Sequence, residues 1–285
     1  MLADARKNHY AIPAFDVSNY EMIRCVAEVC EEEKSPAILM GLQPDLDGKG
    51  LGFITDIANR AAMEYKVPFC LHLDHATEME NIKRAIDAGF SSVMYDGSKL
   101  PFAENAANTA EVVKLAHSCG VTVEAELGHV ADAIAGNNQG LVAASTDAEI
   151  EENFTKPADV VEFVKRTNVD CLAVAVGTAH GVYVKAPKLK IDLLSRIEAD
   201  SPIPLVLHGG SGTPDEEIRA AVAHGITKIN VYSEVLNALN TGLLNKLTSI
   251  QNMSMWPCYV YEDAKNRMKE TIRNKIRVFG SNGRV

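Results

Sequence analysis

The feature that most constrains the fold is a regular alternation of short apolar runs with longer amphipathic segments along nearly the whole chain. The apolar runs occupy residues 10–15, 36–40, 68–73, 91–95, 121–127, 171–176, 204–209 and 228–232. Helical patterns follow them at residues 18–33, 52–65, 78–88, 102–118, 157–167, 188–199, 214–224 and 233–247. Apolar strands that alternate with helices predict a parallel sheet covered by helices. Eight such pairs are the number that closes a (β/α)8 barrel, so we predict a TIM barrel of the α/β class.

An open, doubly wound sheet is the alternative arrangement of the same units. That fold predicts a G-x-G-x-x-G turn after the first strand, whereas residues 15–21 read FDVSNYE. A basic helical pattern at 255–278 predicts an extra C-terminal helix beyond the eighth unit. No linker or low-complexity stretch interrupts the chain, so we expect a single domain over residues 1–285, with its longest irregular loop at 131–145.

The ends of several helices carry recognisable signals. Ser18 and Glu21 have the spacing of a capping box ahead of the first long helix. Thr77 and Thr213 are predicted N-caps, and Pro214 follows the second of them at the expected first helical position. Glycines fall where helix C-caps are expected, just before the next strand: Gly89, Gly120 and Gly225.

The charge balance and the cysteines narrow the class of protein. With 28 lysine and arginine residues against 38 aspartate and glutamate residues, the net charge of −10 argues against nucleic-acid binding. No apolar run approaches the roughly 20 residues of a membrane span, and the N-terminus lacks the apolar core of a signal peptide. Six scattered cysteines without a C-x-x-C pair predict small buried side chains in a reducing compartment. We therefore expect a soluble, cytoplasmic protein with no nucleic-acid or membrane partner.

Polar residues at the ends of the predicted strands mark the candidate site, because a TIM barrel has its active site at the carboxyl ends of its strands. These residues are Asp16, Asp74, His75, Asp96, Glu126, His180 and His208. Three histidines beside carboxylates are typical of a catalytic zinc, which takes three protein ligands and keeps one position open. A lone histidine is more often structural, so we interpret His72 in that way and leave His129 open. The joint placement of three histidines favours a metal site.

Glycine-rich turns follow two of these histidines, and a polar turn follows the eighth predicted strand. The turn residues are Gly181, Gly209, Gly210, Ser211, Asn230, Val231, Tyr232 and Ser233. Such turns expose backbone N–H groups that hold a phosphate, and TIM barrels often place one after strands 7 and 8. Zinc beside a phosphate site fits aldol cleavage or condensation of a phosphorylated ketone. A zinc hydrolase and a non-catalytic sugar-phosphate-binding protein stay open as alternatives.

Six segments of the chain resemble one known family. LHLDHA (71–76), MYDGS (94–98), VEAELGHV (123–130), AVGTAHGVY (175–183), LVLHGGSGTPDEEI (205–218) and KINVYSE (228–234) are similar, in matching order, to the class II, zinc-dependent aldolases of fructose and tagatose bisphosphate. The resemblance runs from Leu2 to about Gly283, which is essentially the whole chain.

The resemblance implies a role for each residue of the candidate site. It implies that His75, His180 and His208 bind zinc and that Asp74 is the acid and base for the aldehyde-derived hydroxyl. Asp96 and Glu126 match a second or alternative cation position, for a divalent or monovalent ion, and the glycine and polar turns listed above match the site for dihydroxyacetone phosphate. It also implies a sugar-phosphate substrate and a homodimer or homotetramer.

Three departures from the family pattern concern the far end of the substrate and the loop after the fifth strand. Asp16 stands where the family commonly has asparagine, and Leu42 stands near a usual serine or threonine. The loop at 131–138 lacks the usual acidic residue, for which only Asp132 could substitute, while Ser233 replaces a threonine and keeps the hydroxyl. A carboxylate at position 16 would repel a second phosphate.

The resulting hypothesis is an aldolase for a ketose 1-phosphate or 1,6-bisphosphate, in which Asp16 favours an aldehyde with a free hydroxyl end. The alternative is a strict tagatose- or fructose-1,6-bisphosphate aldolase. In that alternative a basic residue of the C-terminal helix holds the second phosphate, from this subunit or another: Lys269, Arg273 or Lys275.

Overall fold

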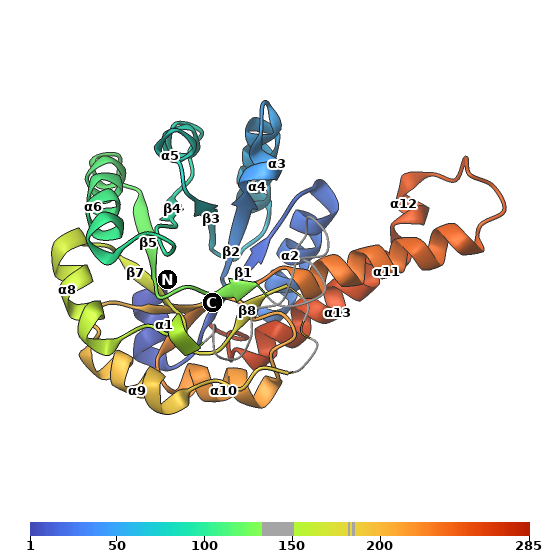
Figure 1. Cartoon of the computed structure of the whole chain (residues 1–285). Coiled ribbons are helices and arrows are strands. Elements are labelled where there is room, and N and C mark those ends of the chain that lie inside the picture. The colour runs from blue at the N-terminus through green and yellow to red at the C-terminus, as the bar shows by residue number, and fades with distance from the viewer. Residues whose placement is uncertain (133–150, 182, 184–185) are drawn as a thin grey trace.

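The computed structural model describes residues 1–132, 151–181, 183 and 186–285. Its centre is a closed barrel of parallel strands (Figure 1), which confirms the predicted fold. The strands are β1 (Ile12–Asp16), β2 (Ala37–Leu42), β3 (Phe69–Ala76), β4 (Ser92–Tyr95), β5 (Thr122–Leu127), β7 (Cys171–Val174), β9 (Leu205–Leu207) and β10 (Ile226–Val231). Around the barrel their order is β1-β10-β9-β7-β5-β4-β3-β2, with β2 closing onto β1.

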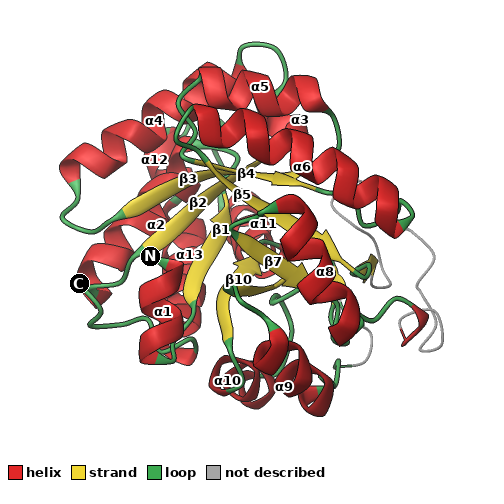
Figure 2. Cartoon of the chain, turned by 90° about the vertical axis from the view of Figure 1, so that its left-hand side faces the viewer, coloured by secondary structure: helices red, strands yellow, loops and turns green. Residues whose placement is uncertain are grey.

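Helices surround the strands (Figure 2), as expected for a parallel barrel. The helices that follow successive strands are α2 (Tyr20–Glu33), α4 (Gly50–Glu64), α5 (Met79–Asp87), α6 (Phe102–Ser118), α8 (Pro157–Thr167), α9 (Ile191–Asp200), α10 (Asp215–Ala223) and α11 (Ser233–Ser249). The predicted C-terminal helix is present as α12 (Pro257–Val260) and α13 (Glu262–Val278), and α13 packs against α2 and α11. The ends of α11 and α13, with α12 between them, project away from the barrel as an arm (Figure 1).

Four short elements were not predicted from the sequence. They are α1 (Leu2–Asn8), α3 (Gln43–Leu46), and the strands β6 (Ala131–Asp132) and β8 (Ala179–His180), which pair in parallel. Asp132 lies opposite His180 in that pairing, while the remainder of the loop predicted at 131–145 lies outside the described residues. None of the helices in the described ranges is long and apolar enough to cross a membrane.

All three predicted N-caps are wrong by one residue. Asn19, not Ser18, caps α2: its extended backbone lets its side chain accept a hydrogen bond from the Met22 N–H at 3.0 Å. Glu78 precedes α5 where Thr77 was expected. Pro214 stands at the N-cap of α10, and the Thr213 hydroxyl donates instead to the Gly209 carbonyl.

Glycine follows three of the helices, as predicted. The three predicted C-terminal glycines follow α5, α6 and α10 and have φ of 95°, 74° and 101°, a conformation that favours glycine: Gly89, Gly120 and Gly225.

All six cysteines are free. The expectation of buried cysteines holds for Cys25, Cys30 and Cys171, whereas Cys119 and Cys258 are exposed at helix ends.

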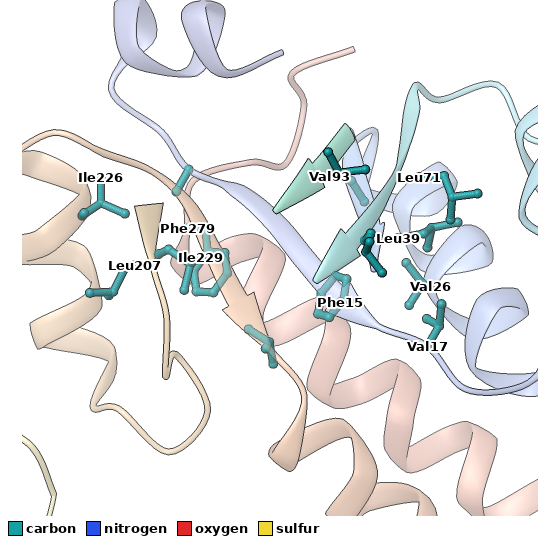
Figure 3. Packing of buried hydrophobic residues seen from close by; sticks show 14 of the residues in the cluster. Phe15, Val17, Val26, Leu39, Leu71, Val93, Leu207, Ile226, Ile229 and Phe279 are labelled. Atoms are coloured by element: carbon teal, nitrogen blue, oxygen red, sulfur yellow. The ribbon is translucent and has the colours of Figure 1, made fainter. Parts of the chain in front are cut away.

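Alternation along the strands divides the core into two parts. One set of strand residues packs outward against the helices in a continuous apolar layer, which includes Phe15, Leu39, Leu71, Leu207 and Ile229 (Figure 3). The intervening residues face the barrel interior. At its N-terminal end that interior is apolar, and Leu2 of α1 packs against it. Toward the other end the interior becomes polar, which is where the candidate site lies.

Candidate active site

A cavity of about 390 Å³ opens at the carboxyl ends of the barrel strands. Most of the predicted site residues line it: Asp16, Asp74, His75, Asp96, Glu126, His180, Gly181, Gly209, Ser211, Asn230, Tyr232 and Ser233. Leu42 lines it as well, together with three residues that were not predicted as site residues, Lys99, His129 and Val130. The inward alternation of the strands explains this gathering, because the last inward position of each strand reaches the same rim.

Three histidines meet beside the cavity, and two of them, His75 and His180, line it. One ring nitrogen from each of His75, His180 and His208 lies within 4.8 Å of the others. The ring of His75 lies 4.9 Å from that of His180 and 4.7 Å from that of His208, and His208 is completely buried. The closed barrel brings together His75 on β3 and His208 at the end of β9, whereas His180 lies on β8, which pairs with β6 outside the barrel sheet.

A local irregularity in β3 brings both Asp74 and His75 to the cavity. In a regular strand two successive side chains would point to opposite faces. The pairing of β3 with β4 shifts register between Leu73 and Ala76, and His75 has a φ of +47°. Left-handed backbone at a residue other than glycine costs about 1–3 kcal/mol and is concentrated at functional sites. The bulge therefore serves the site rather than the sheet.

Carboxylates fix the orientation of two of the three imidazoles. Asp96 Oδ2 lies 2.9 Å from His75 Nδ1, which leaves His75 Nε2 directed at the other histidines. Glu124 Oε1 lies 2.9 Å from His208 Nε2, which leaves His208 Nδ1 on the cavity side. Carboxylates that accept from the second ring nitrogen fix the tautomer of metal-binding histidines. Asp96 is thereby placed beside a candidate ligand, with its other oxygen accepting from the Ser98 N–H.

The donor atoms of the three histidines fit a zinc ion. His180 Nε2 and His208 Nδ1 are buried, and neither has a hydrogen-bond partner among the described residues. Glu126 Oε2 is likewise buried without a hydrogen bond, although it lies 3.2 Å from His208 Nδ1. Buried polar atoms without partners are costly unless a ligand satisfies them. Three imidazole nitrogens with a nearby carboxylate are a donor set that suits zinc.

Burial and neighbouring charges give the three histidines different proton affinities. Burial alone would lower the pKa of His75 and His208, but nearby carboxylates raise them, to about 9 and about 10. For His75 these are Asp74 and Asp96, and for His208 they are Glu124 and Glu126. The pKa of His180 falls well below its ordinary value because of burial and because His75 and His208 lie nearby. The cluster thus sits in a strongly negative setting, which favours a bound cation.

Two buried aspartates on this rim have pKa values that are shifted in opposite directions. Asp74 is 2% exposed, and Asn230 Nδ2 donates to its Oδ1 at 3.2 Å. Although burial alone would raise the pKa of Asp74, His75, Lys228 and the other nearby cations lower it. Burial and the adjacent Asp74 raise the pKa of Asp16 well above its ordinary value. Asp74 is therefore the more acidic of the pair, and Asp16 holds its proton more readily.

The predicted phosphate turns lie together beside the start of α11. The Ser211 hydroxyl oxygen accepts from the backbone N–H groups of Tyr232, at 3.1 Å, and Glu234, at 3.3 Å. Its own proton therefore stays available to donate into the cavity. The N-terminus of a helix of this length favours an anion through its dipole and its N–H groups.

Two residues predicted in these turns do not line the cavity, so the prediction needs correction there. Gly210 donates its backbone N–H to the Asn230 carbonyl at 3.0 Å, which removes it as a phosphate donor. A side chain at Gly210 would lie 2.5 Å from Ile229, so this glycine allows close packing of the turn. Val231 is completely buried in the apolar layer between barrel and helices.

A charged pair beneath the cavity was missed by the sequence analysis. Glu124 and Lys228 are each 1% exposed, and Lys228 Nζ lies 2.7 Å from Glu124 Oε2. The same carboxylate holds His208, so the pair is connected to the candidate zinc site. His72, predicted to be structural, is buried beside them and lies 2.8 Å from the Ser92 hydroxyl through Nδ1. One sequence signal exists: each charged residue lies two positions before a predicted site residue on the same strand.

The basic residues of the C-terminal helix lie elsewhere in this chain. Lys269 pairs with Glu28, and Arg273 pairs with two glutamates at the end of α2. Lys275 is 3% exposed, and its Nζ lies 2.6 Å from Glu234 Oε2. It lines a second cavity, of about 710 Å³, that shares the Ser211 edge of the phosphate turns. None of the three lines the cavity that contains the histidines.

Comparison with known proteins agrees with this geometry. The model of the family described as fructose-bisphosphate aldolase class-II matches residues 1–284. The chain belongs to the class II aldolases. It is therefore a lyase of carbohydrate metabolism, from a family that depends on zinc and acts on sugar phosphates.

Solved structures show the same relationship for this class II aldolase. The YdjI aldolase from Escherichia coli K12 is 33% identical, with a TM-score of 0.85 over 99% of this chain and 96% of that one. A Coccidioides immitis protein assigned as a fructose-1,6-biphosphate aldolase is 30% identical, with the same TM-score and coverage. The fructose-bisphosphate aldolase of Campylobacter jejuni, at 22% identity and a TM-score of 0.82 over 99% of this chain and 93% of that one, shows the shared fold.

Proposed function

We propose that this class II aldolase reversibly cleaves a ketose 1-phosphate or ketose 1,6-bisphosphate into dihydroxyacetone phosphate and an aldehyde. The observation that carries the proposal is the meeting of three histidine nitrogens within 4.8 Å beside the buried carboxylate of Asp74. A metal-binding cluster supplies an electrophile, and an ionised carboxylate next to it supplies a base.

We propose His75, His180 and His208 as the zinc ligands. Zinc, when bound, acts as a Lewis acid that polarises the carbonyl of the ketose. Glu126, Asp96 and His75 form a second group of donor atoms within 4.8 Å, which supports an alternative position for the same ion or for a second divalent or monovalent cation. Asp96 in addition orients His75 through their hydrogen bond.

Asp74 is the proposed acid and base. In cleavage, Asp74 takes the proton of the hydroxyl on C4, the C3–C4 bond breaks, and its electron pair remains with the dihydroxyacetone half. In synthesis the same carboxyl returns the proton to the new hydroxyl. Asn230 holds Asp74 Oδ1, which leaves Oδ2 directed at the cavity, 3.8 Å from His75 Nε2. The lowered pKa of Asp74 keeps it ionised and able to accept the proton.

The dihydroxyacetone phosphate half is assigned to the turns beside α11. Ser211, Ser233 and the backbone of Gly181 and Gly209 face the cavity there, and the start of α11 favours the phosphate dianion. Asn230 and Tyr232 lie on the same side of the cavity and support this half. For the C3 proton, only Asp132 could substitute for the acid that the family has in the loop after the fifth strand.

A panel of substrates tests the reaction and the role of Asp16. The purified enzyme is given matched ketose 1-phosphates and 1,6-bisphosphates, and dihydroxyacetone phosphate is followed with a coupled dehydrogenase. Release of that triose phosphate from at least one ketose is the expected result. Release of inorganic phosphate alone would indicate a hydrolase, and a borohydride-trapped lysine adduct would indicate metal-independent chemistry.

Asp16→Asn is measured beside the unmodified enzyme, because it removes the charge and keeps the shape. If Asp16 acts as an anion that repels a second phosphate, the substitution raises kcat/KM for the bisphosphate relative to the 1-phosphate. Burial and the adjacent Asp74 raise the pKa of Asp16 well above its ordinary value, which disfavours its anionic form, so we expect a smaller rise in the ratio than removal of a fully ionised carboxylate would give.

We further propose that residues 1–285 form one domain and that this domain assembles as a homodimer or homotetramer. Large apolar side chains on the projecting arm support assembly, because an arm of this kind would bury them in an interface: Leu244, Leu247, Met253, Trp256 and Tyr259. Trp256 is 71% exposed. Light scattering of Trp256→Ser and unmodified protein over a range of concentrations tests the role of the arm.

A further inference from the structure

The cavity contains one strong cation. Among the described residues that line it, Lys99 is the single lysine or arginine, whereas Asp16, Asp74, Asp96 and Glu126 supply four carboxyl groups. Lys99 follows β4, and its side chain is exposed. Within the described part of the chain, its ammonium has no carboxylate partner within 4.0 Å, although acids are abundant on the same rim. An unpaired cation that faces a cavity is available to a ligand.

The turn that carries Lys99 is fixed by its own hydrogen bonds. The Ser98 N–H donates to Asp96 Oδ1 at 3.1 Å, and the Leu100 N–H donates to the Gly97 carbonyl at 2.9 Å. The Ser98 hydroxyl lies 3.0 Å from His129 Nδ1. Because Asp96 also holds His75, the position of Lys99 is tied to that of the histidine cluster. The turn is therefore a rigid base for one flexible, charged side chain.

The order of the strands places Lys99 opposite the phosphate turns. In the closed barrel, β4 and β10 are separated by three strands in either direction, so they face each other across the axis. Ser233 begins α11 just after β10, and Lys99 lies in the turn after β4. A substrate with its phosphate beside α11 that passes the histidines and Asp74 on β3 would end near β4, where Lys99 lies. A substrate that ended near β2 instead would meet the apolar side chain of Leu42.

We propose that Lys99 is a specificity-determining residue that binds an anionic group, a carboxylate or a phosphate, on the far end of the aldehyde half of the substrate. This inference rests on the proposed aldol reaction and names the substrate class within it. It also assigns the second anion site to β4, because Lys269, Arg273 and Lys275 are each paired with glutamates outside this cavity.

Three ketose 1-phosphates test the proposal. They share chain length and stereochemistry and end in a hydroxymethyl group, a carboxylate or a phosphate. We measure kcat/KM for each with the unmodified enzyme, with Lys99→Met and with Lys99→Arg. Lys114→Met is the matched control, because Lys114 lies exposed on α6 outside the cavity. All measurements are made at low and at high salt.

The expected result is a preference of the unmodified enzyme for at least one anionic substrate. Lys99→Met lowers the ratio of anionic to neutral kcat/KM by about 10- to 100-fold, as for loss of one charge-assisted hydrogen bond. Lys99→Arg retains most of the ratio, Lys114→Met leaves it unchanged, and salt lowers it for the unmodified enzyme. Comparison of the carboxylate with the phosphate shows which anion the site takes.

Two outcomes overturn the inference while leaving the aldol reaction intact. One is a preference for the hydroxymethyl substrate by the unmodified enzyme. The other is an equal loss for neutral and anionic substrates in Lys99→Met, which is what a merely structural lysine gives. Failure of the unmodified enzyme to release dihydroxyacetone phosphate from any of the three would overturn the proposed function itself, so the two failures are distinguishable.

Discussion

Replacement of Glu124 by glutamine is expected to destabilise the protein by about 3–5 kcal/mol, because it leaves the charge of Lys228 buried without a partner. The carboxylate accepts from Lys228 Nζ at 2.7 Å, and both side chains are 1% exposed. Breaking a buried ion pair from one side typically has this cost, whereas an exposed pair contributes about 0–1 kcal/mol.

The structure also sets an upper limit on this cost. In the unmodified protein burial alone would lower the pKa of Lys228, but Glu124 raises it above its ordinary value of 10.5. Without Glu124 the lysine is free to release its proton. Neutralising an ordinary lysine at pH 7 requires about 4.6 kcal/mol, so the charge contributes no more than that to the loss.

The pH dependence follows from the sign of the pKa change. In the variant, Lys228 has a lower pKa in the folded state than in the unfolded state, so between these two values the folded state binds fewer protons. Its stability therefore rises with pH, by up to about 1.4 kcal/mol per unit. In the unmodified protein the folded-state pKa is raised, so the stability from this lysine is lost only above about pH 10.5. The difference between the two proteins should shrink from pH 7 to pH 9.

Urea unfolding of chelator-treated proteins, followed by circular dichroism at pH 7, 8 and 9, measures this difference without a contribution from bound zinc. Glu162→Gln is the control, because it breaks the exposed pair of Glu162 with Arg166 on α8 and should change stability by less than about 1 kcal/mol. A loss below 1 kcal/mol for Glu124→Gln at pH 7, or a loss that is constant up to pH 9, would refute the reasoning.

Two further predictions concern the candidate site. Asp74→Asn should lower turnover by about 10²–10⁴-fold, the usual contribution of acid–base catalysis, while zinc content measured by atomic absorption stays near that of the unmodified enzyme; a parallel loss of zinc would argue against the assignment. Removal of zinc by a chelator should abolish release of dihydroxyacetone phosphate and leave the barrel folded by circular dichroism, because a core of this size does not depend on an ion. His180→Ala should lose zinc and turnover together, and full activity of the metal-free enzyme would contradict both expectations.

The residues that the sequence placed correctly are those fixed by strand order. His75 and His208 are far apart in the chain, yet each follows directly on a predicted strand, and a barrel brings all strand ends to one rim, while His180 lies in the segment that follows the predicted strand at 171–176. The same argument located Asp74, Asp96 and Glu126. Strand periodicity and barrel closure were therefore sufficient for the cavity, without any side-chain contact being known in advance.

The residues that the sequence misplaced depend on local geometry. The N-cap of α2 fell on Asn19 because its extended backbone brought its amide to Met22, while Ser18 turned toward the hydroxyl of Tyr232. Gly210 resembled a phosphate donor, but its N–H was already bonded to Asn230. The choice between two such hydrogen-bonding arrangements depends on free-energy differences of about 1 kcal/mol. A pattern of residue types does not resolve differences of that size.

Lys99 and the pair of Glu124 and Lys228 were missed for different reasons. Lys99 lies in a turn, where an exposed lysine is ordinary. Only its position at the cavity indicates a function. Glu124 and Lys228 lie inside apolar runs on β5 and β10, and in the sequence they look like unfavourable core residues. Barrel closure makes them partners across 104 positions of sequence. Their contact depends on the inward layer of the barrel, which can be inferred only after the register of both strands is known.

Removing both charges of this buried pair separates its effect on the zinc site from its contribution to the stability of the protein. Glu124→Gln with Lys228→Met leaves no isolated buried charge, so most of the stability lost in Glu124→Gln alone should return, with a coupling energy of about 2–3 kcal/mol in the double-mutant cycle. The amide oxygen of the glutamine still accepts from His208 Nε2, but as a neutral group it makes that imidazole a weaker ligand. Zinc affinity, measured by competition with a chromogenic chelator, should therefore remain about 10-fold below that of the unmodified enzyme in both the single and the double variant. Recovery of stability without recovery of zinc affinity would show that the ion pair is retained for the orientation and basicity of His208. Recovery of both would mean that Glu124 acts on His208 only through the packing of Lys228.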